Sequence, residues 1–543
     1  MTSSRCISLK LEPKATPLFL DYLYHYDRVA RFYGGSPHEF ASYQRVASAI
    51  EGLYPHRAEL AAALLRQNQA LGGSEKTIAN IHRLEDPKTF AVVAGQQVGL
   101  FSGPAFTLYK ALTAVRVAAT LSEQGLSAVP VFWLATEDHD LAEVAQNAVL
   151  NESGSLIPFE VAGNAPAPGC SVGYIKLADQ VDQALAAVEG SLPPGEARER
   201  LMSDLRECYA PGTRWGEAFG RFMGRLFGRF GVILIDPLEE AFHRLTSGLY
   251  FKSMRDAAGI RRLLQSRSQE LTAAGYHAQV HVSDDSTLVF AAVKGARTAV
   301  RSIEGGFRAG DISANRAEME AWVESRPIEF TPSALLRPIV QDTLLPTIAY
   351  IPGPSELAYY AQSQSIYAEY GRPMPVLYPR ASFTIASGHT QRLLEKYHLA
   401  LEDVWKDEEH LRRRIAAAAA TGDGSWPERI DEGEKDLKEL FDQIESDAGR
   451  IDPTLLDAVK NTREKVLYQI ERLRGKMSRA ALAHSDLLAR HERTIQSFLM
   501  PGGNLQERAV GGVSFLGRTG YSLLDDLMGQ IHAECMDHQY IVF

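Results

Sequence analysis

The chain has 543 residues, of which 45% are hydrophobic and 23% are charged, and its formal net charge is −10. It is too long for one hydrophobic core, so two or three domains are expected. The acidic balance gives no case for binding nucleic acid or an anionic membrane, and no apolar run reaches the roughly 18 residues needed to span a bilayer.

Residues 1–90 are predicted to be mostly helical, and residues 1–13 lack the apolar core of a signal peptide. The cysteines lie far apart and include no CxxC pair; they are Cys6, Cys170, Cys208 and Cys535. We therefore expect neither a disulfide framework nor a cysteine zinc site, and a reducing cytoplasm is the setting that this pattern indicates.

The stretch 91–140 has the pattern of a βαβ unit. The apolar run Ala91–Ala94 ends in a glycine-rich polar loop, a helical pattern follows Pro104, and a second apolar run covers Val129–Ala135. Such a unit is right-handed and builds a parallel sheet. Ligands of open parallel sheets bind beyond the carboxyl ends of the strands, where both polar clusters of this unit lie.

These two clusters supply the first candidate site residues. The candidates for binding substrate or nucleotide are Gln96, Gln97, Gly99, Ser102, Gly103, Glu137 and Asp140. Asp138 or His139 is the predicted general base, and helix capping by Asp138 or Asp140 is the alternative. The loop fits neither GxGxxG nor GxxxxGK[ST], and because adjacent residues rarely converge on one ion, no metal is predicted.

Two insertions are expected in the core. After Asp140 a helix is predicted to about Val149, and residues 151–185, rich in Gly, Pro, Ala and Ser, indicate an inserted subdomain. A buried strand, Val232–Ile235, follows. Alternating apolar residues across 276–307 then predict antiparallel hairpins within a second insertion, about 262–330.

A second βαβ unit follows the second insertion. A predicted strand, Thr347–Ile351, is followed by a Gly/Pro loop, a helix and the strand Pro375–Tyr378. Candidates for binding substrate or nucleotide in this loop and helix are Gly353, Ser355, Glu356 and Tyr359. Arg380, at a strand end, is the predicted cation for a phosphate or carboxylate, whereas Lys110 is either a phosphate contact or a surface lysine.

From about residue 386 helical patterns dominate. A heptad spacing holds over Val466, Ile470, Leu473, Met477, Ala480, His484, Leu487 and His491, which predicts a coiled-coil helix of about 45 residues. It needs a partner: we expect an antiparallel hairpin with the preceding helix, and a second subunit is a natural extension. The two histidines are interpreted as fixing register. We divide the chain into a core, 1–385, a helical coiled-coil domain, 386–503, and a tail, 504–543, that packs back on the core.

Several long blocks of the chain resemble the cysteine ligases of bacillithiol biosynthesis. The blocks are GQQVGLFSGPAFTLYKA, VPVFWLATEDHD, LRPIVQDTLLPTIAYIPGPSELAYYAQ, MPVLYPRASFT and LQER. The resemblance implies an α/β fold: a Rossmann-like parallel-sheet core with inserted connecting subdomains, plus an α-helical coiled-coil domain that makes a homodimer. It also implies that the chain joins the carboxylate of L-cysteine to the amine of glucosaminyl malate, and it transfers no catalytic residues.

Amide formation from a free carboxylate requires activation, so ATP or another adenine nucleotide is the expected cofactor. The N–H groups of the 96–103 loop and of the following helix start are the predicted phosphate donors. Two other functions stay open. One is a synthetase-like enzyme that handles nucleotide or tRNA, disfavoured by the acidic charge and by the lack of an HxGH pair. The other is a coiled-coil scaffold with an inactive core.

Overall fold

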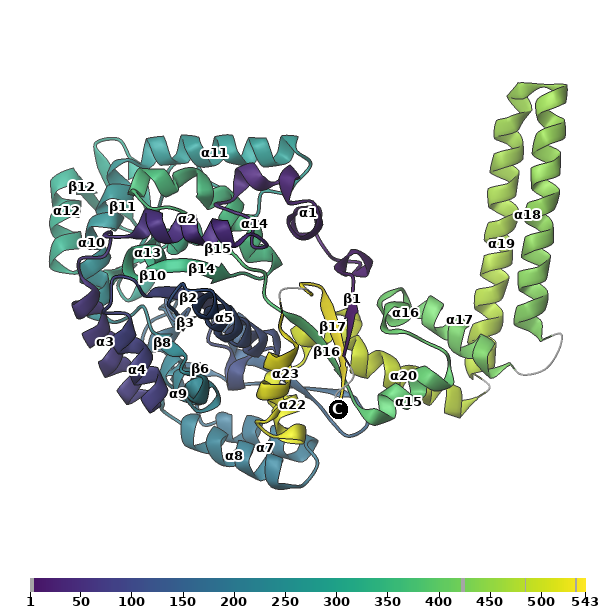
Figure 1. The fold of residues 1–543 in the computed structure, drawn as a ribbon, viewed down its shortest axis with the longest axis horizontal. Coiled ribbons are helices and arrows are strands. Elements are labelled where there is room, and N and C mark those ends of the chain that lie inside the picture. Colours follow the sequence, from purple (N-terminus) through teal and green to yellow (C-terminus); the bar gives the residue numbers. More distant parts are fainter. Residues whose placement is uncertain (1–3, 421–424, 484, 533–534) are drawn as a thin grey trace.

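The computed structural model describes residues 4–420, 425–483, 485–532 and 535–543. Figure 1 shows a rounded core, with most of its helices around a central sheet, and a long helical hairpin that projects from it. No helix in the described ranges combines the length and the apolar character that a membrane crossing requires.

The core is built on a parallel sheet of strand order β15-β14-β2-β3-β8. Its strands are β2 Phe90–Gln96, β3 Ala128–Leu134, β8 Ile233–Ile235, β14 Thr347–Ile351 and β15 Val376–Leu377. Helix α5 (Phe106–Glu123) connects β2 to β3, and α14 (Pro354–Ser363) lies between β14 and β15, so both predicted βαβ units are confirmed. The predicted α/β fold with a Rossmann-like core is also confirmed.

The two faces of this sheet are covered by different parts of the chain. Val92 and Ala94 face the hydrophobic cluster that contains α5, whereas Ala91 and Val93 face the cluster that contains the amino-terminal helices. Successive residues point to opposite faces of a strand, so a strand covered on both sides is apolar throughout. The helices of the first 90 residues are α1 Pro17–Tyr24, α2 Phe40–Ile50, α3 Arg57–Ala70 and α4 Glu75–Arg83, with short turns η1 Leu9–Leu11, η2 Tyr26–Arg28 and η3 Ala30–Phe32.

The first insertion is more extended than its sequence predicts. The prediction of a helix up to about Val149 is wrong. Helix α6 covers only Leu141–Ala145, and residues 146–150 form a strand that pairs with β5. The carboxyl-terminal tail binds this strand too, since Gly511 N–H donates to Ala148 O and Leu150 N–H to Ser514 Oγ. The elements are β4 Gln146–Leu150, β5 Leu156–Glu160, β6 Gly163–Asn164, η5 Val172–Tyr174, β7 Lys176–Leu177, α7 Val181–Ser191, α8 Glu196–Cys208, α9 Trp215–Phe227 and η6 Gly228–Phe230.

The second insertion forms a separate antiparallel sheet of order β12-β11-β10-β9-β13, as its alternation predicts. The alternating residues 278–282 are an exception, since they form a loop and the first strand begins at Ser286. The elements between β8 and β14 are α10 Glu240–Arg255, α11 Ala257–Ala273, β9 Ser286–Val293, β10 Ala296–Ile303, β11 Gly306–Ala309, β12 Ile312–Asn315, α12 Arg316–Ser325, η7 Pro327–Glu329, β13 Phe330–Pro332 and α13 Arg337–Leu344. The short helix η8 Gln364–Tyr370 follows α14 in the core.

The coiled-coil region forms an antiparallel hairpin of α18 and α19, the projecting arm in Figure 1. The prediction of a single helix of about 45 residues is wrong, because α19 ends at Ala483 and Ser485 caps a new helix. His491 packs on Tyr397 and accepts or donates a hydrogen bond with its hydroxyl, and His484 lies outside the described residues. The helices are α15 Gly388–Lys396, α16 Leu401–Trp405, α17 Glu408–Ala419, α18 Trp426–Ile451, η9 Pro453–Leu455, α19 Leu456–Ala483 and α20 Asp486–Leu499.

The tail returns to the core, and its last strand joins both ends of the chain. Strand β17 (His538–Val542) pairs antiparallel with β1 (Ser4–Ile7) and parallel with β16 (Ser382–Ala386). We expected no disulfide framework; the structure instead joins Cys6 to Cys535. Cysteine spacing gives no sign of this bridge, because the two residues meet only through the β1–β17 pairing. The tail helices are η10 Pro501–Gly503, α21 Gln506–Ala509, α22 Gly512–Thr519 and α23 Leu523–Gln530.

A buried polar cluster holds the tail against β16. Glu507 forms an ion pair with Arg380 at 2.6 Å and accepts a hydrogen bond from the Ser382 hydroxyl. The ring of His538 lies between two hydroxyls, with Nδ1 2.7 Å from Ser382 Oγ and Nε2 2.8 Å from Thr384 Oγ1. Burial lowers the pKa of His538 from 6.5 to about 4.

We expect His538 to make folding stability depend on pH. The unfolded chain binds a proton at this residue below pH 6.5 and the folded chain only below about pH 4. The free energy of unfolding therefore falls as pH drops through this window, by roughly 3 kcal/mol in full. Urea unfolding at pH 7 and pH 4.5 measures the fall, which should shrink in His538→Gln. An exposed control, His56→Gln, should keep the wild-type fall; an equal fall in all three proteins would contradict the assignment.

Candidate functional site

A cavity of about 750 Å³ lies at the carboxyl ends of β2, β3 and β14. Sites for small molecules typically have volumes of about 300–1,000 Å³. The inserted antiparallel sheet closes one side of the cavity through Phe290 and Arg297, and the tail contributes Arg508. Core, insertion and tail thus meet at the edge of the sheet where a ligand is expected.

The structure brings most of the sequence-predicted site residues to this cavity. Those that line it are Gln96, Gln97, Glu137, Asp138, Gly353, Ser355, Glu356, Tyr359 and Arg380. Those that are not among its lining residues are Gly99, Ser102, Gly103, His139 and Asp140. The two polar clusters of the first βαβ unit therefore contribute unequally, and only the first residues of each reach the cavity.

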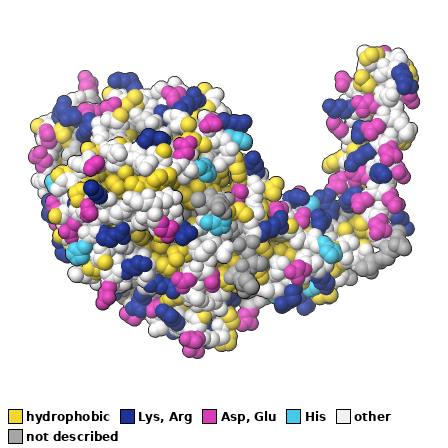
Figure 2. All heavy atoms as spheres, viewed as in Figure 1, with side chains coloured by type: hydrophobic (Ala, Val, Ile, Leu, Met, Phe, Trp, Pro, Cys, Tyr) yellow, Lys and Arg dark blue, Asp and Glu magenta, His cyan; other side chains and the backbone are white. Residues whose placement is uncertain are grey.

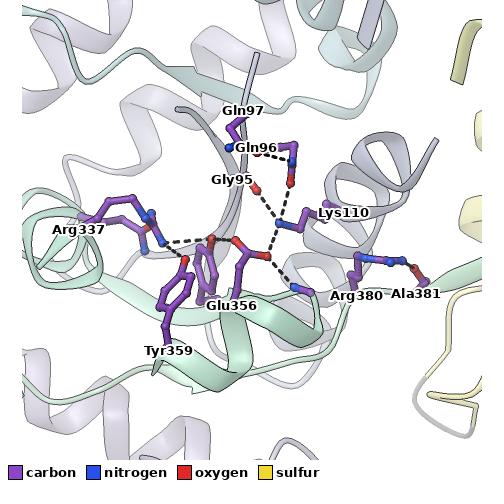
Figure 3. A network of polar contacts seen from close by, with 12 residues as sticks. Gly95, Gln96, Gln97, Lys110, Arg337, Glu356, Tyr359, Arg380 and Ala381 are labelled. Atoms are coloured by element: carbon purple, nitrogen blue, oxygen red, sulfur yellow. Dashed lines mark hydrogen bonds and ion pairs between the residues drawn. The ribbon is translucent and has the colours of Figure 1, made fainter. Parts of the chain in front are cut away.

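A buried lysine organises one wall of the cavity (Figure 3). Lys110 Nζ lies 2.8 Å from Gly95 O and 3.1 Å from Gln96 Oε1, and it forms an ion pair with Glu356. Its side chain is only 2% exposed, so the surface-lysine interpretation is wrong. An ammonium group has three donors, and these three acceptors use all of them.

Glu356 is held ionised by its neighbours. Its carboxylate accepts hydrogen bonds from the Tyr350 hydroxyl and from Gly353 N–H, each at 2.6 Å, the latter satisfying the N-cap N–H at the start of α14. Burial raises the pKa of this carboxyl, but Lys110 and these two donors outweigh burial and hold the pKa below its ordinary value. Glu356 is therefore ionised and has a structural role in this wall, and it has no proton to donate.

Two arginines bring positive charge that no carboxylate neutralises directly. Arg337 donates to Gln341 Oε1 at 3.0 Å and to the Tyr359 hydroxyl at 3.0 Å. Arg297 lies over the Phe290 ring and donates to Pro332 O at 2.7 Å. Within the described residues neither guanidinium forms an ion pair with a carboxylate, and both line the cavity. Guanidinium groups of this kind suit carboxylate or phosphate ligands.

Arg380, unlike Arg297 and Arg337, is paired with a carboxylate. The sequence predicts it as the cation for a phosphate or carboxylate, and it does line the cavity. However, its Nη2 is engaged by Glu507 of the tail at 2.6 Å. Arg508, the next tail residue, is exposed and lines the cavity as well.

Glu137 is the titratable group of the cavity that is best poised near neutral pH. Its side chain is almost fully buried, and its carboxylate receives no hydrogen bond from any residue that the structure describes. Its pKa is raised to about 7, chiefly by burial and also by Asp236 and Asp138, while Arg297 and Arg337 oppose the rise. A carboxylate with this pKa exchanges a proton readily at neutral pH, as general acid–base catalysis requires.

The neighbours of Glu137 on the same loop have structural partners. Asp140 caps α6 by accepting from Glu143 N–H at 3.1 Å, which was the alternative to a site role. Asp138 accepts from the His139 N–H at 2.7 Å and from Gln97 Nε2 at 3.2 Å. His139 is about half exposed, with Nδ1 3.3 Å from the Arg297 guanidinium. Asp138 and His139 remain predicted bases, but the geometry favours Glu137.

The glycine-rich loop is used for packing. A Cβ on Gly99 would lie 2.7 Å from the Gly103 Cα, and Gly103 has a positive φ of 66°. The N–H of Gly103 donates to Leu100 O, and the N–H of Ala105, before α5, donates to Val510 O of the tail. These N–H groups are therefore not available for phosphate oxygens. The Ser102 hydroxyl is buried and makes no hydrogen bond to any described residue.

Sequence reasoning named Glu137 only as a binding residue, and it did not single out Arg297 or Arg337. Arg297 comes from the inserted sheet, and nothing in its local pattern marks it. Arg337 begins α13 beside a proline, within a block that the resemblance includes, but position alone assigns it no partner. A search for basic residues in those blocks would have found Arg337.

Comparisons with known proteins agree along the whole chain. Residues 3–381 match the family model described as bacillithiol biosynthesis BshC, N-terminal Rossmann-like domain, and residues 383–543 match the BshC C-terminal coiled-coil domain. Relatives named "Putative cysteine ligase BshC" include one from Koribacter versatilis and one from Solibacter usitatus. Each is 36% identical, with 99% of both chains covered. A third, from Salinibacter ruber, is 31% identical over 96% of each chain. The chain therefore belongs to the BshC family of bacillithiol biosynthesis proteins.

Proposed function

We propose that the chain is a cysteine ligase that joins L-cysteine to the amine of glucosaminyl malate, the last step of bacillithiol biosynthesis. Membership of the BshC family and the names of the relatives support this class of reaction. The observation that supports placing the reaction in this cavity is the environment of Glu137. This carboxylate has a pKa of about 7 and lies in a cavity where two arginines have no carboxylate partner.

Glu137 would act on the attacking amine. The amine nitrogen attacks the activated carbonyl carbon of cysteine, the C–N bond forms, and the activating group leaves with its oxygen. The nitrogen must lose a proton for the neutral amide to result, and that proton passes to Glu137. A base with a pKa near the working pH is ionised often enough to accept the proton and basic enough to hold it.

Arg297 and Arg337 would bind the anionic parts of the substrates. Glucosaminyl malate carries carboxylates, and a nucleotide carries phosphates, so both substrates present oxygens that match a guanidinium. Arg337 is oriented by Tyr359, and Arg297 is fixed by Pro332 O and the Phe290 ring. Because both donor groups are already positioned, little side-chain entropy is lost when an anion binds.

An ATP-type nucleotide remains the proposed source of activation, since it converts a carboxylate into an acyl group with a good leaving group. The residues present fit an anionic co-substrate, although not through the predicted loop. In that loop the Gly99 and Gly103 N–H groups are bonded to backbone oxygens, and Gly99, Ser102 and Gly103 do not line the cavity, so we assign phosphate recognition to the guanidinium groups of the cavity.

Replacement of Glu137 tests this mechanism. The rate of amide formation should rise with pH through about 7 in the wild type, because Glu137 must be ionised to accept the proton. Glu137→Gln keeps the shape but not the base, so kcat should fall by about 10²–10⁴-fold and the rise near pH 7 should vanish. Steady-state assays from pH 5.5 to 9 measure both.

Asp138→Asn and His139→Gln provide the comparison for Glu137→Gln. Both are expected to keep the pH dependence of the wild type and most of its kcat. If either variant abolishes the rise near pH 7 while Glu137→Gln retains it, the base is one of the two residues that the sequence predicts.

A homodimer through the arm remains the proposed assembly. The arm exposes apolar side chains, among them Leu440, Ile451, Tyr468 and Leu473, of which Ile451 is 78% exposed. Figure 2 shows acidic and basic side chains interspersed with hydrophobic ones on the arm. Exposed apolar residues with flanking charges of both signs are typical of a surface that pairs with another helix.

Sedimentation velocity tests this assembly. The wild type should sediment as a dimer, and a double change, Leu440→Glu with Leu473→Glu, should give a monomer because burying two carboxylates in a helix interface is costly. The matched control is Leu263→Glu, an exposed leucine on α11. A wild-type monomer, or a dimer that persists in the double variant, would rule out pairing through this face.

A further inference from the structure

The Cys6–Cys535 bridge lies at the edge of the small three-stranded sheet. The strand order is β1-β17-β16, so β1 has β17 as its single neighbour among the described strands. Strand β1 has four residues, Ser4–Ile7, and Cys6 pairs with Gln539 in the register. The bridge therefore fastens a short edge strand that is otherwise held by its pairing with β17, by the ion pair of Arg5 with Glu402 and by the burial of Ile7.

The bridge is accessible to solvent. Cys6 is exposed and Cys535 is partly exposed, whereas the remaining cysteines, Cys170 and Cys208, are buried free thiols. Exchange requires that a thiolate approach one sulfur of the disulfide in line with the bond, so exposure favours attack at Cys6. Burial raises the pKa of Cys208 to about 11, which leaves it protonated and unreactive.

The two strands next to the bridge are held to the core unequally. Strand β17 is fixed to β16 by backbone pairing and by the buried ring of His538, which contacts the Ser382 and Thr384 hydroxyls. Beyond β1, Leu9 N–H donates to Asp537, and Lys14 Nζ lies 2.8 Å from Gly503 O of the tail. If the bridge opens, β1 has the weaker attachment and β17 the stronger.

We propose that the Cys6–Cys535 bridge is a site of thiol–disulfide exchange with low-molecular-weight thiols, and that opening it releases β1 from β17. In the first step a thiolate RS⁻ attacks Cys6 Sγ, an S–S bond to R forms, and Cys535 leaves as a thiolate. A second RS⁻ attacks the mixed disulfide, releasing RSSR and the Cys6 thiolate. The protein gains two electrons and, at neutral pH, two protons, and two RSH are oxidised to RSSR.

This inference goes beyond the proposed function and does not depend on catalysis. If the chain makes bacillithiol, its product belongs to the class of thiols that the bridge would exchange with, and the bridge would report the state of that pool. The test below uses glutathione and requires no substrate, so its failure and the failure of the proposed ligase activity are separate results.

Alkylation and hydrogen exchange of the full-length protein test the proposal. The protein is equilibrated at several ratios of reduced to oxidised glutathione, alkylated without denaturant, and analysed by peptide mass spectrometry. Cys6 and Cys535 should pass together from bridged to alkylated as the ratio rises, while Cys170 and Cys208 stay unreacted. In the reduced protein the amides of residues 4–7 should exchange at least tenfold faster, and those of β16 should not change.

Two variants make the result decisive. Cys6→Ser should show fast exchange in β1 at every glutathione ratio, and Cys170→Ser, which removes a buried thiol far from the bridge in sequence, should behave like the wild type. A bridge that fails to form in oxidised glutathione, or that stays closed at every ratio, overturns the proposal. Opening without faster exchange in β1 overturns it as well, because the bridge would then fasten nothing.

Discussion

The ion pair between Lys110 and Glu356 is the interaction on which the cavity depends, because it joins α14 to β2 and α5, which lie far earlier in the chain. Lys110 comes from α5, Glu356 from the first turn of α14, and the acceptors Gly95 and Gln96 from the end of β2. Removing one partner of a buried ion pair leaves an uncompensated charge, which typically costs about 3–5 kcal/mol. The pair is therefore a positional constraint: α5 and α14 can pack on the sheet only where these charges meet.

The charged groups of the cavity fall into two classes: those paired with each other within the protein, and those left unpaired that can interact with a ligand. Glu356 is neutralised by Lys110 and Glu507 by Arg380, so these carboxylates stay ionised without attracting other cations. Glu137 has no such partner and is buried, which is why its pKa rises to about 7. Arg297 and Arg337 lower that pKa but form no ion pair with it. The same electrostatic arrangement thus leaves one proton acceptor and two anion-binding groups facing a common space.

Much of this framework could be predicted from the sequence, because its signals are local. Apolar runs ending in polar turns gave both βαβ units, and the rule that ligands bind beyond the strand ends placed Gln96, Glu137 and Glu356 at one edge. Local signals also misled. The glycines at 99 and 103 suggested phosphate binding, although the structure uses them for a tight turn in which both of their N–H groups donate to backbone oxygens.

What could not be predicted depends on contacts between residues far apart in the chain. Arg297 reaches the cavity only because the inserted sheet folds over the core, and Arg380 is engaged by a glutamate 127 residues later. The Cys6–Cys535 bridge depends on the pairing of the first and last strands. The choice of Glu137 over Asp138 as base rests on burial, which neighbouring positions in a sequence do not reveal.

A crystal structure of the enzyme with cysteine, glucosaminyl malate and a non-hydrolysable ATP analogue would test the central claim most directly. The account predicts ligand in the cavity, with anionic oxygens on Arg297 and Arg337 and the amine nitrogen within about 2.6–3.2 Å of the Glu137 carboxylate. Ligands bound outside this cavity, or an amine directed away from Glu137, would contradict it.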